Sequence, residues 1–319
     1  MKRKKILITG IVSLLGKYLT NQLRSTYEIF GTIHNSHSSE NIHLTSDHFV
    51  SVEITNESQL SHCIHTIKPD IVIHLAAVSN IDYCESHPDT ARAVNAGGTR
   101  LLCKILTDLN IHLLFVSSNA VFDGCAPPYD ESAIPNPLNI YGQTKVAAEC
   151  IILQSKLKAT IIRCTSLFGI PPTGARDNDF TYYLQQLNQK KAIYLVNDLF
   201  FNPVYAATAA TAIGIMIERG RMGIFHIAGK DRVTRFTFVE SIINVLGIKH
   251  HPPLIPVTHD YFQKLAPRPK DATLSTASAQ KILKIIPRPL VSELRLLLRE
   301  TPSKYRSLMP ALPQKLRGE

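Results

Sequence analysis

The sequence contains no run of eighteen apolar residues, and its six cysteines include no Cys-x-x-Cys pair. A helix needs about 20 predominantly apolar residues to cross a membrane, so we predict no membrane span. The cysteines also lack any metal-ligand spacing. In a chain of this length they are expected to be reduced thiols, which predicts neither a disulfide framework nor a metal site.

A signal-peptide cleavage pattern is also missing, although the start of the chain resembles a signal peptide. Met1–Lys5 is basic and Ile6–Leu15 is largely apolar, but no small-x-small motif follows. Thr9-Gly10 interrupts the apolar run at the point where a strand would turn into a helix. We therefore expect this segment to belong to the fold and the protein to be cytoplasmic.

The chain has fewer acidic than basic residues. The chain has 35 Lys and Arg against 25 Asp and Glu, which gives a formal net charge of +10 at pH 7. From Lys281 onward, nine Lys or Arg accompany three Glu. Such a segment can contact an acidic partner or a membrane surface, or it can be a solvated face. We predict the solvated face and no nucleic-acid partner; a positive field elsewhere would suit a phosphate-bearing substrate.

Short apolar segments alternate with helical patterns through the first half of the chain. Six of them have the length and composition of buried strands: Ile6–Thr9, Glu28–Ile33, Phe49–Val52, Asp70–Ala77, Ile111–Val116 and Thr160–Arg163. Helices are expected between them, among others over Pro88–Leu109 and Lys145–Gln154. This alternation predicts an α/β fold with a doubly wound parallel (Rossmann) sheet.

The stretch Gly169–Gly174 breaks this rhythm, and the elements that follow are shorter and mixed. We expect a dinucleotide-binding Rossmann domain over residues 1–168, which segments near 196–226 rejoin. A smaller mixed α/β substrate-binding portion would cover 169–300, and a basic, proline-containing tail 301–319. The elements expected after the break are helices near Phe180–Leu187, Thr237–Leu246 and Val291–Arg299 and strands near Ala192–Val196 and Gly223–Ile227.

The first strand leads into a glycine-containing turn that is typical of nucleotide binding. The spacing is Gly-x-x-Ser-x-x-Gly, from Gly10 through Ser13 to Gly16. A first glycine permits a tight turn, a later one lets the helix pack on the strand, and the helix N-terminus offers free N–H groups to a pyrophosphate. Ser13 stands where a third glycine is usual, and its hydroxyl could donate to the phosphates. Cofactor contacts are predicted for Gly10, Ser13, Leu14, Leu15 and Gly16.

No Asp or Glu ends the second strand, where an acidic residue would bind the ribose of NAD. His34 and Asn35 stand there instead, and polar donors at this position favour NADP, with NAD as the second choice. Glu53 and Ile54 follow the third strand, and the carboxylate is expected either to meet the adenine amino group or to cap the next helix.

Small residues end the fourth strand, where Ala76 and Ala77 would let the backbone pass close to a cofactor. Asn95 is predicted as a further cofactor contact. Beside Gly97-Gly98 it is unfavourable in a helix, which predicts a polar kink under the site or a satisfied core side chain. His74, on the apolar strand, is expected to be structural.

The strand Ile111–Val116 releases into Ser117 and Ser118, which places Ser118 at its carboxyl end, where open α/β sheets bind ligands. Tyr141 and Lys145 follow four residues apart, on one face of a helix-like segment. The phenol has a reference pKa of about 10, and we expect the nearby ammonium to lower it toward a useful value. A hydroxyl, a phenol and an ammonium arranged in this way can move a proton to or from a carbonyl oxygen.

In combination, these motifs resemble those of the extended short-chain dehydrogenase/reductases. More narrowly, the chain resembles the dTDP-4-dehydrorhamnose reductase family, which also includes methionine adenosyltransferase β-subunit-like members. The likeness runs from about Lys5 to about Arg299. The residues that carry it are Ser117–Gly124, Pro128-Tyr129, Glu131, Pro135, Tyr141–Lys145, Arg163, Phe168-Gly169, Asp198, Asn202–Tyr205, Gly223–Gly229, Arg268-Pro269 and Ala272–Ser275.

The resemblance implies an NADP-dependent reductase that delivers hydride to C4 of a nucleotide-activated 4-keto-6-deoxy sugar. Tyr141 would protonate the oxygen, Ser118 would hydrogen-bond it, and Lys145 would hold the nicotinamide ribose. Arg268 would bind the sugar-nucleotide phosphates through bidentate pairing. The substrate contacts implied in full are Ser79, Asn119, Ala120, Phe122, Asn202 and Arg268, with a homodimer as the expected assembly.

One departure from the family pattern, and one feature shared with the regulatory subunit, keep other functions open. Asn119-Ala120 replaces the usual Asp-Tyr pair, and Ser-Ser-Asn is the start shared with the regulatory subunit. A dehydratase would need an Asp-Glu pair beside the hydroxyl residue, which this chain lacks. The alternatives are therefore a sugar-nucleotide epimerase of the same superfamily or a non-catalytic NADP-binding regulatory subunit.

Overall fold

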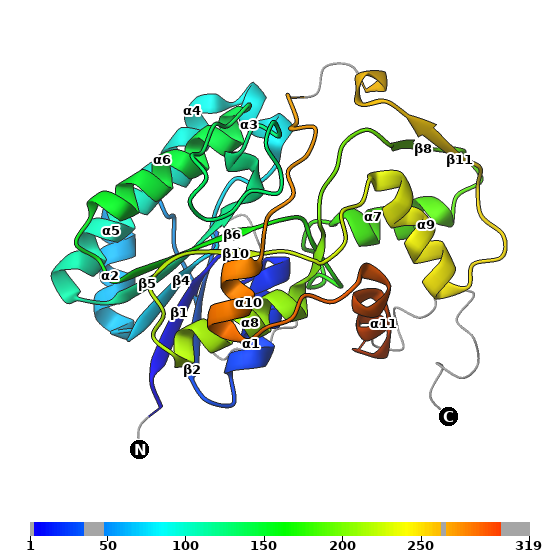
Figure 1. Cartoon of the computed structure of the whole chain (residues 1–319). Coiled ribbons are helices and arrows are strands. Elements are labelled where there is room, and N and C mark those ends of the chain that lie inside the picture. Colours follow the sequence, from blue (N-terminus) through cyan, green and yellow to red (C-terminus); the bar gives the residue numbers. More distant parts are fainter. Residues whose placement is uncertain (1–2, 35–47, 263–265, 301–319) are drawn as a thin grey trace.

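The computed structural model describes residues 3–34, 48–262 and 266–300, and its centre is a seven-stranded parallel sheet (Figure 1). Six short apolar segments form strands near their predicted positions, and a seventh comes from later in the chain. They are β1 (Lys5–Thr9), β2 (Glu28–Ile33), β3 (Phe49–Ser51), β4 (Ile71–His74), β5 (His112–Ser118), β6 (Ala159–Cys164) and β10 (Gly223–Ile227).

The strand order is β10-β6-β5-β4-β1-β2-β3, and every pair is parallel. The order reverses between β1 and β4, because the chain winds outward from β1 in one direction and from β4 in the other. Ligands of such sheets bind outside the carboxyl ends of the strands at this switch point. The predicted doubly wound Rossmann sheet is confirmed.

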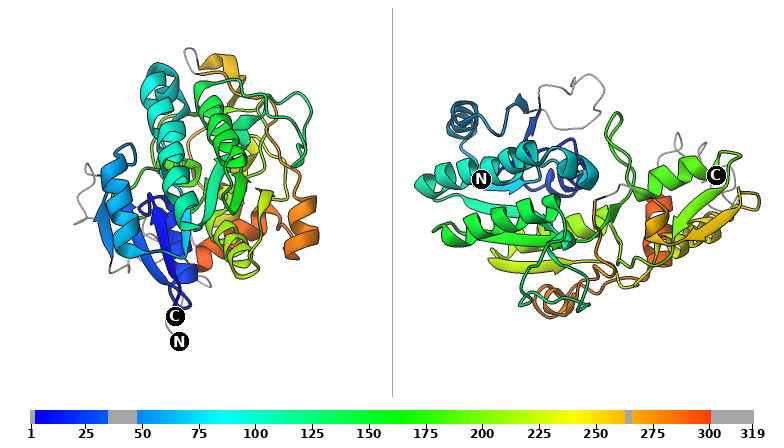
Figure 2. Two further views of the ribbon diagram at one scale, coloured as in Figure 1. Left: turned by 90° about the vertical axis from the view of Figure 1, so that its left-hand side faces the viewer. Right: turned by 90° about the horizontal axis from the view of Figure 1, so that it is seen from above.

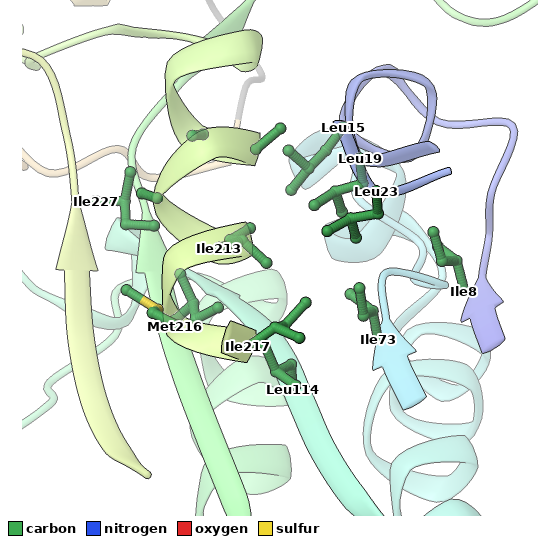
Figure 3. Close-up of a cluster of buried hydrophobic side chains, with 14 of the residues drawn as sticks. Ile8, Leu15, Leu19, Leu23, Ile73, Leu114, Ile213, Met216, Ile217 and Ile227 are labelled. Carbon is green, nitrogen blue, oxygen red and sulfur yellow. The ribbon is translucent and has the colours of Figure 1, made fainter. Parts of the chain in front are cut away.

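One face of the sheet is covered by α1 (Leu14–Leu23), α8 (Ala206–Glu218) and α10 (Ala277–Leu283). Figure 3 shows Leu15, Leu19 and Leu23 of α1 packed toward Ile213 and Ile217 of α8, with sheet side chains beneath them. The sequence did not predict α8. Eight of its thirteen residues are buried, so its polar face is too narrow to give the alternation of polar and apolar residues by which an amphipathic helix is recognised.

The opposite face carries α2 (Glu57–Ile67), α5 (Gly98–Leu109) and α6 (Ile140–Gln154). The predicted helix Pro88–Leu109 is present as α4 (Pro88–Ala91) and α5, joined by a π-helical segment over Arg92–Gly97. The predicted Lys145–Gln154 helix starts earlier, at Ile140, because Asn139 caps it by accepting a hydrogen bond from the Gly142 amide at 2.9 Å. Tyr141 therefore lies in the first turn of α6. A short α3 (Ile81–Ser86) precedes α4.

A second hydrophobic cluster forms a small lobe beside the sheet (Figure 2). It consists of α7 (Asp179–Leu187), α9 (Arg235–Leu246), α11 (Leu290–Glu300) and the parallel pair β8 (Ile193–Val196) and β11 (Leu254–Val257). The short strands β7 (Leu167–Phe168) and β9 (Val204–Tyr205) pair with each other nearby. The segments near 196–226, which were predicted to rejoin the Rossmann domain, contain α8 and most of β10, and both elements pack with the central sheet. The helix α10 lies in the segment predicted as the smaller portion but also packs with the central sheet, because its apolar side chains complete the cover of that sheet.

None of the helices in the described part of the chain is long and apolar enough to cross a membrane.

A buried ion pair fixes α6 to the sheet. Arg163 of β6 donates from Nε to Glu149 Oε1 at 3.1 Å and from Nη2 to Oε2 at 2.7 Å, and both side chains are 3% exposed. Ser117 Oγ donates to the same carboxylate at 2.5 Å. Arg163 also approaches Nε2 of His226 at 3.5 Å, and burial, with Arg163 nearby, lowers the pKa of this histidine to about 4. The histidine is therefore neutral at pH 7, and the network carries one balanced pair of charges.

Replacing Glu149 by Gln removes one charge of this pair and leaves the Arg163 guanidinium buried without its counterion. We expect the free energy of unfolding to fall by about 3–5 kcal/mol. Urea denaturation monitored by circular dichroism measures this loss. The matched control is Glu57→Gln, which breaks the exposed Lys104–Glu57 pair (2.7 Å) and should cost at most about 1 kcal/mol. Equal losses in the two variants would contradict the stabilising role given to the buried pair.

Candidate active site

A cavity of about 1470 Å³ runs along the carboxyl edge of the central sheet. The ends of β1, β2, β4, β5 and β6 line it, and the loop before α7 forms a further wall. Its volume exceeds the roughly 300–1,000 Å³ typical of small-ligand pockets. The cavity therefore has room for a dinucleotide together with a second ligand.

The turn after β1 lies at one part of this cavity and has the geometry of a phosphate cradle. Gly10 adopts φ +67°, and a Cβ there would lie 2.9 Å from the amide nitrogen of Ala76. Ser13 keeps an ordinary extended backbone (φ −72°), so glycine is not needed at this position. Its Oγ caps α1 by accepting a hydrogen bond from the Gly16 amide at 3.1 Å. The hydroxyl proton of Ser13 stays available to a phosphate oxygen.

Gly16 does not line the cavity. A Cβ at this position would come within 2.2 Å of the carbonyl oxygen of Ile11, so the glycine serves the close packing of α1 on the turn. Leu14 and Leu15 do line the cavity, as do Ala76 and Ala77 at the end of β4. The prediction of a direct cofactor contact for Gly16 is therefore corrected to a packing role.

Elsewhere in the cavity lining, His34 after β2 and Glu53 after β3 form a pair. His34 Nε2 lies 2.6 Å from Glu53 Oε2, and Thr55 Oγ1 donates to Glu53 Oε1 at 3.0 Å. Burial acts to raise the pKa of Glu53, but the hydrogen bonds from Thr55 and His34 outweigh it and the pKa is lowered. Both residues and Ile54 line the cavity. Asn35, predicted beside them, lies outside the described residues.

Asn95 and His74 support the site from behind. Asn95 is 2% exposed, accepts a hydrogen bond from the Val78 amide at 2.8 Å and donates to Thr144 Oγ1 of α6 at 2.9 Å. It is a satisfied core side chain in the π-helical segment, and it does not line the cavity. The direct cofactor contact predicted for Asn95 is therefore corrected to support of the site. His74 bonds Thr9 Oγ1 and Thr99 Oγ1, and burial lowers its pKa to about 3, in keeping with a structural histidine.

Ser118, Tyr141 and Lys145 come together at the end of β5 and line the cavity. Ser118 Oγ accepts a hydrogen bond from the Ala120 amide at 3.1 Å, and its side chain is hydrogen-bonded to the phenol of Tyr141. Lys145 is 4% exposed and donates from Nζ to the carbonyl oxygen of Val116 at 2.9 Å. Its ammonium lies 6.0 Å from the centre of the Tyr141 ring.

The electrostatics of this group differ from the expectation. Burial raises the pKa of Tyr141 to about 12, and the hydrogen bond to Ser118 offsets only part of that rise. Burial also lowers the pKa of Lys145 to about 8, against the opposing effect of Glu149. The predicted lowering of the phenol pKa by Lys145 is therefore wrong for this structure. Because the phenol stays protonated at neutral pH, it is suited to donate a proton.

On the predicted substrate side, Ser79, Asn119 and Ala120 line the cavity and three further residues do not. Phe122 is fully buried and stacks on Tyr129 with a centroid distance of 4.1 Å. Asn202 is 5% exposed and donates to the carbonyl oxygen of Leu274 at 2.9 Å. Contacts to substrate from Phe122 and Asn202 are therefore corrected to internal contacts, because their side chains are enclosed by protein.

Arg268 also lies away from the cavity lining. Its Nη2 donates to both carboxylate oxygens of Asp82 at 2.9 Å, and its Nη1 donates to the carbonyl oxygen of Ala266 at 2.6 Å. The guanidinium that was predicted to bind substrate phosphates is thus engaged by protein groups in this structure.

Part of the cavity wall was not predicted from the sequence. Ile81 and Tyr83 of α3, the loop 173–179 and Tyr182 of α7 also line it. The loop follows the proline-glycine stretch that breaks the β/α rhythm, and that break was the signal available. Across the described chain, no group of three or more His, Cys, Asp or Glu is arranged to hold a metal ion.

Comparisons with known proteins show what the sequence and the fold of this chain are similar to. The crystal structure of dTDP-4-dehydrorhamnose reductase from Bacillus anthracis in complex with NADP matches with a TM-score of 0.82 and 26% identity, covering 94% of this chain and 100% of that chain. Methionine adenosyltransferase 2 subunit beta from Rattus norvegicus is 26% identical over 298 residues, covering 88% of this chain and 82% of the relative. The probable low-salt glycan biosynthesis reductase Agl14 from Haloferax volcanii is 28% identical over 243 residues, covering 75% and 79%.

A family model described as the RmlD substrate binding domain matches residues 4–302. That match spans nearly the whole chain, and the fold is that of an NADP-bound dTDP-4-dehydrorhamnose reductase, as the motifs around Ser118 and Tyr141 indicated. The chain therefore belongs to the RmlD substrate binding domain family, within the extended short-chain dehydrogenase/reductases.

Proposed function

We propose that the protein is an NADP-preferring reductase of a nucleotide-activated 4-keto-6-deoxy sugar, of the dTDP-4-dehydrorhamnose reductase type. The observation that carries this proposal is the meeting of Ser118, Tyr141 and Lys145 at the end of β5, in a cavity with room for two ligands. The burial that keeps the phenol in its acid form supports the reductive direction, because reduction of a ketone needs a proton donor.

The residues along the cavity fit a dinucleotide. A Cβ at Gly10 would obstruct the cradle beside Ala76, and the N-terminus of α1 offers its amides at the same turn. Lys145 is buried, and one N–H of its ammonium bonds the carbonyl oxygen of Val116; its other N–H groups would hold the nicotinamide ribose. When bound, NADPH would supply the hydride that reduces C4 of the sugar.

Tyr141 would give its proton to the sugar oxygen as the carbonyl is reduced to the alcohol. Ser118 would hydrogen-bond the same oxygen. In other enzymes, removing one such preorganised donor raises the activation barrier by about 2.7–4 kcal/mol. Lys145, charged below about pH 8, stabilises the phenolate left after the proton moves. The residues that would complete the pocket around the sugar are Ser79, Asn119 and Ala120.

Two features support NADP over NAD. No carboxylate ends β2 itself, where His34 stands, and Glu53 is engaged by His34 and Thr55. The reductase from Bacillus anthracis was crystallised in complex with NADP. NAD is the alternative nucleotide.

A second candidate function is that of a nucleotide-binding regulatory subunit. Similarity to methionine adenosyltransferase 2 subunit beta over 88% of the chain favours it, together with the shared Ser-Ser-Asn start at residues 117–119. A panel of nucleotide-linked 4-keto-6-deoxy sugars, assayed by loss of NADPH absorbance, separates the two. Turnover on one sugar supports the reductase, whereas nucleotide binding without turnover and a stoichiometric partner that co-purifies would support the subunit. Tightly retained NAD would instead indicate the epimerase.

Replacing Tyr141 by Phe removes the proton donor and keeps the ring. We expect turnover to fall by about 10²–10⁴-fold, with NADPH binding retained. The assay is the rate of NADPH oxidation with the substrate found in the panel. Tyr182→Phe is the matched control, because Tyr182 lines the same cavity at 49% exposure, and its turnover should stay close to that of the wild type. Turnover retained in Tyr141→Phe would refute the assigned proton donor.

NADPH binding should weaken as pH rises through about 8, because Lys145 loses its charge there while Tyr141 stays protonated to about 12. Fluorescence titration with NADPH across this range measures the dissociation constant, which should rise with pH above about 8. Arginine stays charged to a pKa above about 12, so Lys145→Arg should remove the rise wherever it still binds NADPH. A dissociation constant that is unchanged between about pH 7 and about pH 9.5 in the wild type would contradict the role given to Lys145.

A further inference from the structure

One of the segments that join the small lobe to the large part of the molecule runs beside the active site. We call residues 266–274 the strap; in Figure 1 it descends toward α10 in orange. It has no helix. Backbone hydrogen bonds join it to Tyr129 and Phe200, and its Leu274 is buried in a cluster with Phe122 and Tyr129. At Gly124 it passes so close that an added Cβ would lie 2.8 Å from the amide nitrogen of Lys270.

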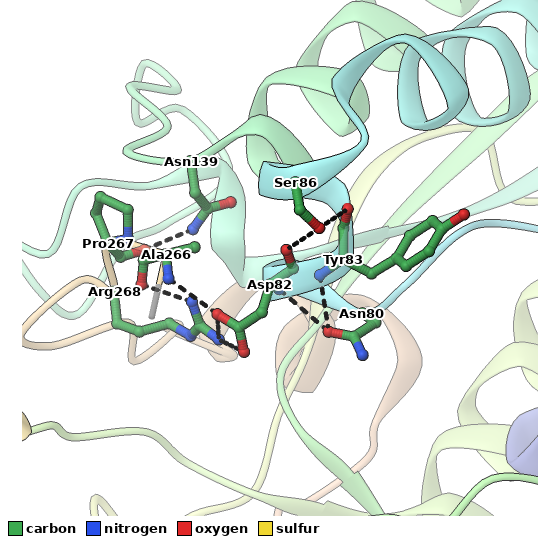
Figure 4. Close-up of polar contacts among 8 residues, drawn as sticks. All are labelled: Asn80, Asp82, Tyr83, Ser86, Asn139, Ala266, Pro267 and Arg268. Atoms are coloured by element: carbon green, nitrogen blue, oxygen red, sulfur yellow. Dashed lines mark hydrogen bonds and ion pairs between the residues drawn. The ribbon is translucent and has the colours of Figure 1, made fainter. Parts of the chain in front are cut away.

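One end of the strap is held by α3 through Asp82 (Figure 4). The carboxylate of Asp82 accepts both hydrogen bonds from Arg268 Nη2, each 2.9 Å, and a third from the Ala266 amide at 2.9 Å. Arg268 closes the loop by donating to the carbonyl oxygen of Ala266. Asn80 in turn caps α3 by accepting from the amide of Asp82 at 3.1 Å. The pair is partly exposed, at 40% for Asp82 and 26% for Arg268.

Pro267, between Ala266 and Arg268, connects the Asp82–Arg268 pair to the start of α6. The carbonyl oxygen of Pro267 accepts a hydrogen bond from Asn139 Nδ2 at 2.8 Å. Asn139, 1% exposed, is the residue whose Oδ1 caps α6 at the Gly142 amide. Figure 4 shows Asn139 and Pro267 beside the Asp82–Arg268 pair. Tyr141 lies between the capping residue and the amide that it caps.

A second bond from α3 reaches the same helix terminus. Glu85 Oε2 accepts a hydrogen bond from the amide of Ile140 at 3.0 Å. Further along the strap, the carbonyl oxygen of Ala272 accepts from Asn119 Nδ2 at 2.9 Å, next to Ser118. The strap and α3 together thus contact both elements that carry the proton-transfer residues.

We propose that Asp82 and Arg268 are positioning residues that act as a clasp: they hold the strap where Pro267 fixes Asn139, and Asn139 fixes the first turn of α6 and Tyr141. In the described structure Arg268 donates hydrogen bonds to Asp82 and to the carbonyl oxygen of Ala266, and it does not line the cavity. The clasp therefore orients Tyr141 through the helix cap, and its kinetic consequences rest on the proposed reductase function.

The structural part of the proposal is tested by hydrogen exchange, which needs no activity. In Arg268→Gln we expect the amides at the start of α6 (residues 140–143) to exchange about fivefold faster, the factor that loss of a helix cap typically brings. Asp82→Asn should give the same acceleration, although it keeps an oxygen for the Ala266 amide. The double variant should be no faster than either single one, because both break the same unit.

The matched control is Arg232→Gln. Arg232 donates to Asp271 at 2.6 Å, so this variant breaks another ion pair of the same strap without touching Asn139. Its exchange at residues 140–143 should match the wild type. Unchanged exchange in Arg268→Gln, or equal acceleration in Arg232→Gln, would overturn the clasp. Should Arg268→Gln fail to fold, the exchange rates of residues 140–143 in Asp82→Asn, compared with those in Arg232→Gln, test the clasp.

Kinetics distinguish the clasp from direct binding of substrate phosphates. A clasp predicts that Asp82→Asn and Arg268→Gln both lower kcat about tenfold, with the KM for the sugar nucleotide unchanged, as expected for a displaced proton donor. A phosphate-binding Arg268 predicts a higher KM in Arg268→Gln alone and would overturn the proposal. If the wild type itself has no turnover, the proposed function fails while the exchange experiment still tests the clasp.

Discussion

The position of α6 depends on one buried carboxylate. Glu149 receives both the guanidinium of Arg163 and the hydroxyl of Ser117, so a single side chain joins α6 to β5 and β6. Removing two charges from water is costly, and only the bidentate geometry and the additional hydrogen bond offset that cost. Ser117 precedes Ser118, and Glu149 lies one helical turn beyond Lys145. The same unit that anchors the helix therefore sets the spacing of Ser118, Tyr141 and Lys145.

Burial determines the protonation states at that group. The walls that exclude water disfavour both the phenolate of Tyr141 and the ammonium of Lys145, which moves their pKa values apart, to about 12 and about 8. Glu149 opposes the effect at Lys145, and this opposition retains a cation beside Tyr141 at neutral pH. A neutral acid next to a cation is the arrangement that reduction of a carbonyl requires.

The cavity depends on both parts of the molecule. The strand ends supply the turn at Gly10, the small residues after β4 and the group at Ser118, whereas α3, the loop 173–179 and Tyr182 close the remaining sides. The family match covers both parts, over residues 4–302.

The sequence by itself determined the parallel sheet, the turn at Gly10 and the pairing of Tyr141 with Lys145. Each of these depends on local patterns: apolar runs of strand length, glycine at a tight turn, and side chains one helical turn apart. Tertiary structure decided the rest. Phe122, Asn202 and Arg268 occur in motifs that implied substrate contact, yet each contacts another part of the protein. Phe122 stacks on Tyr129, whereas Asn202 bonds Leu274 and Arg268 bonds Asp82, two partners that are distant in sequence. The high pKa of Tyr141 likewise comes from enclosure by several elements, which no local spacing encodes.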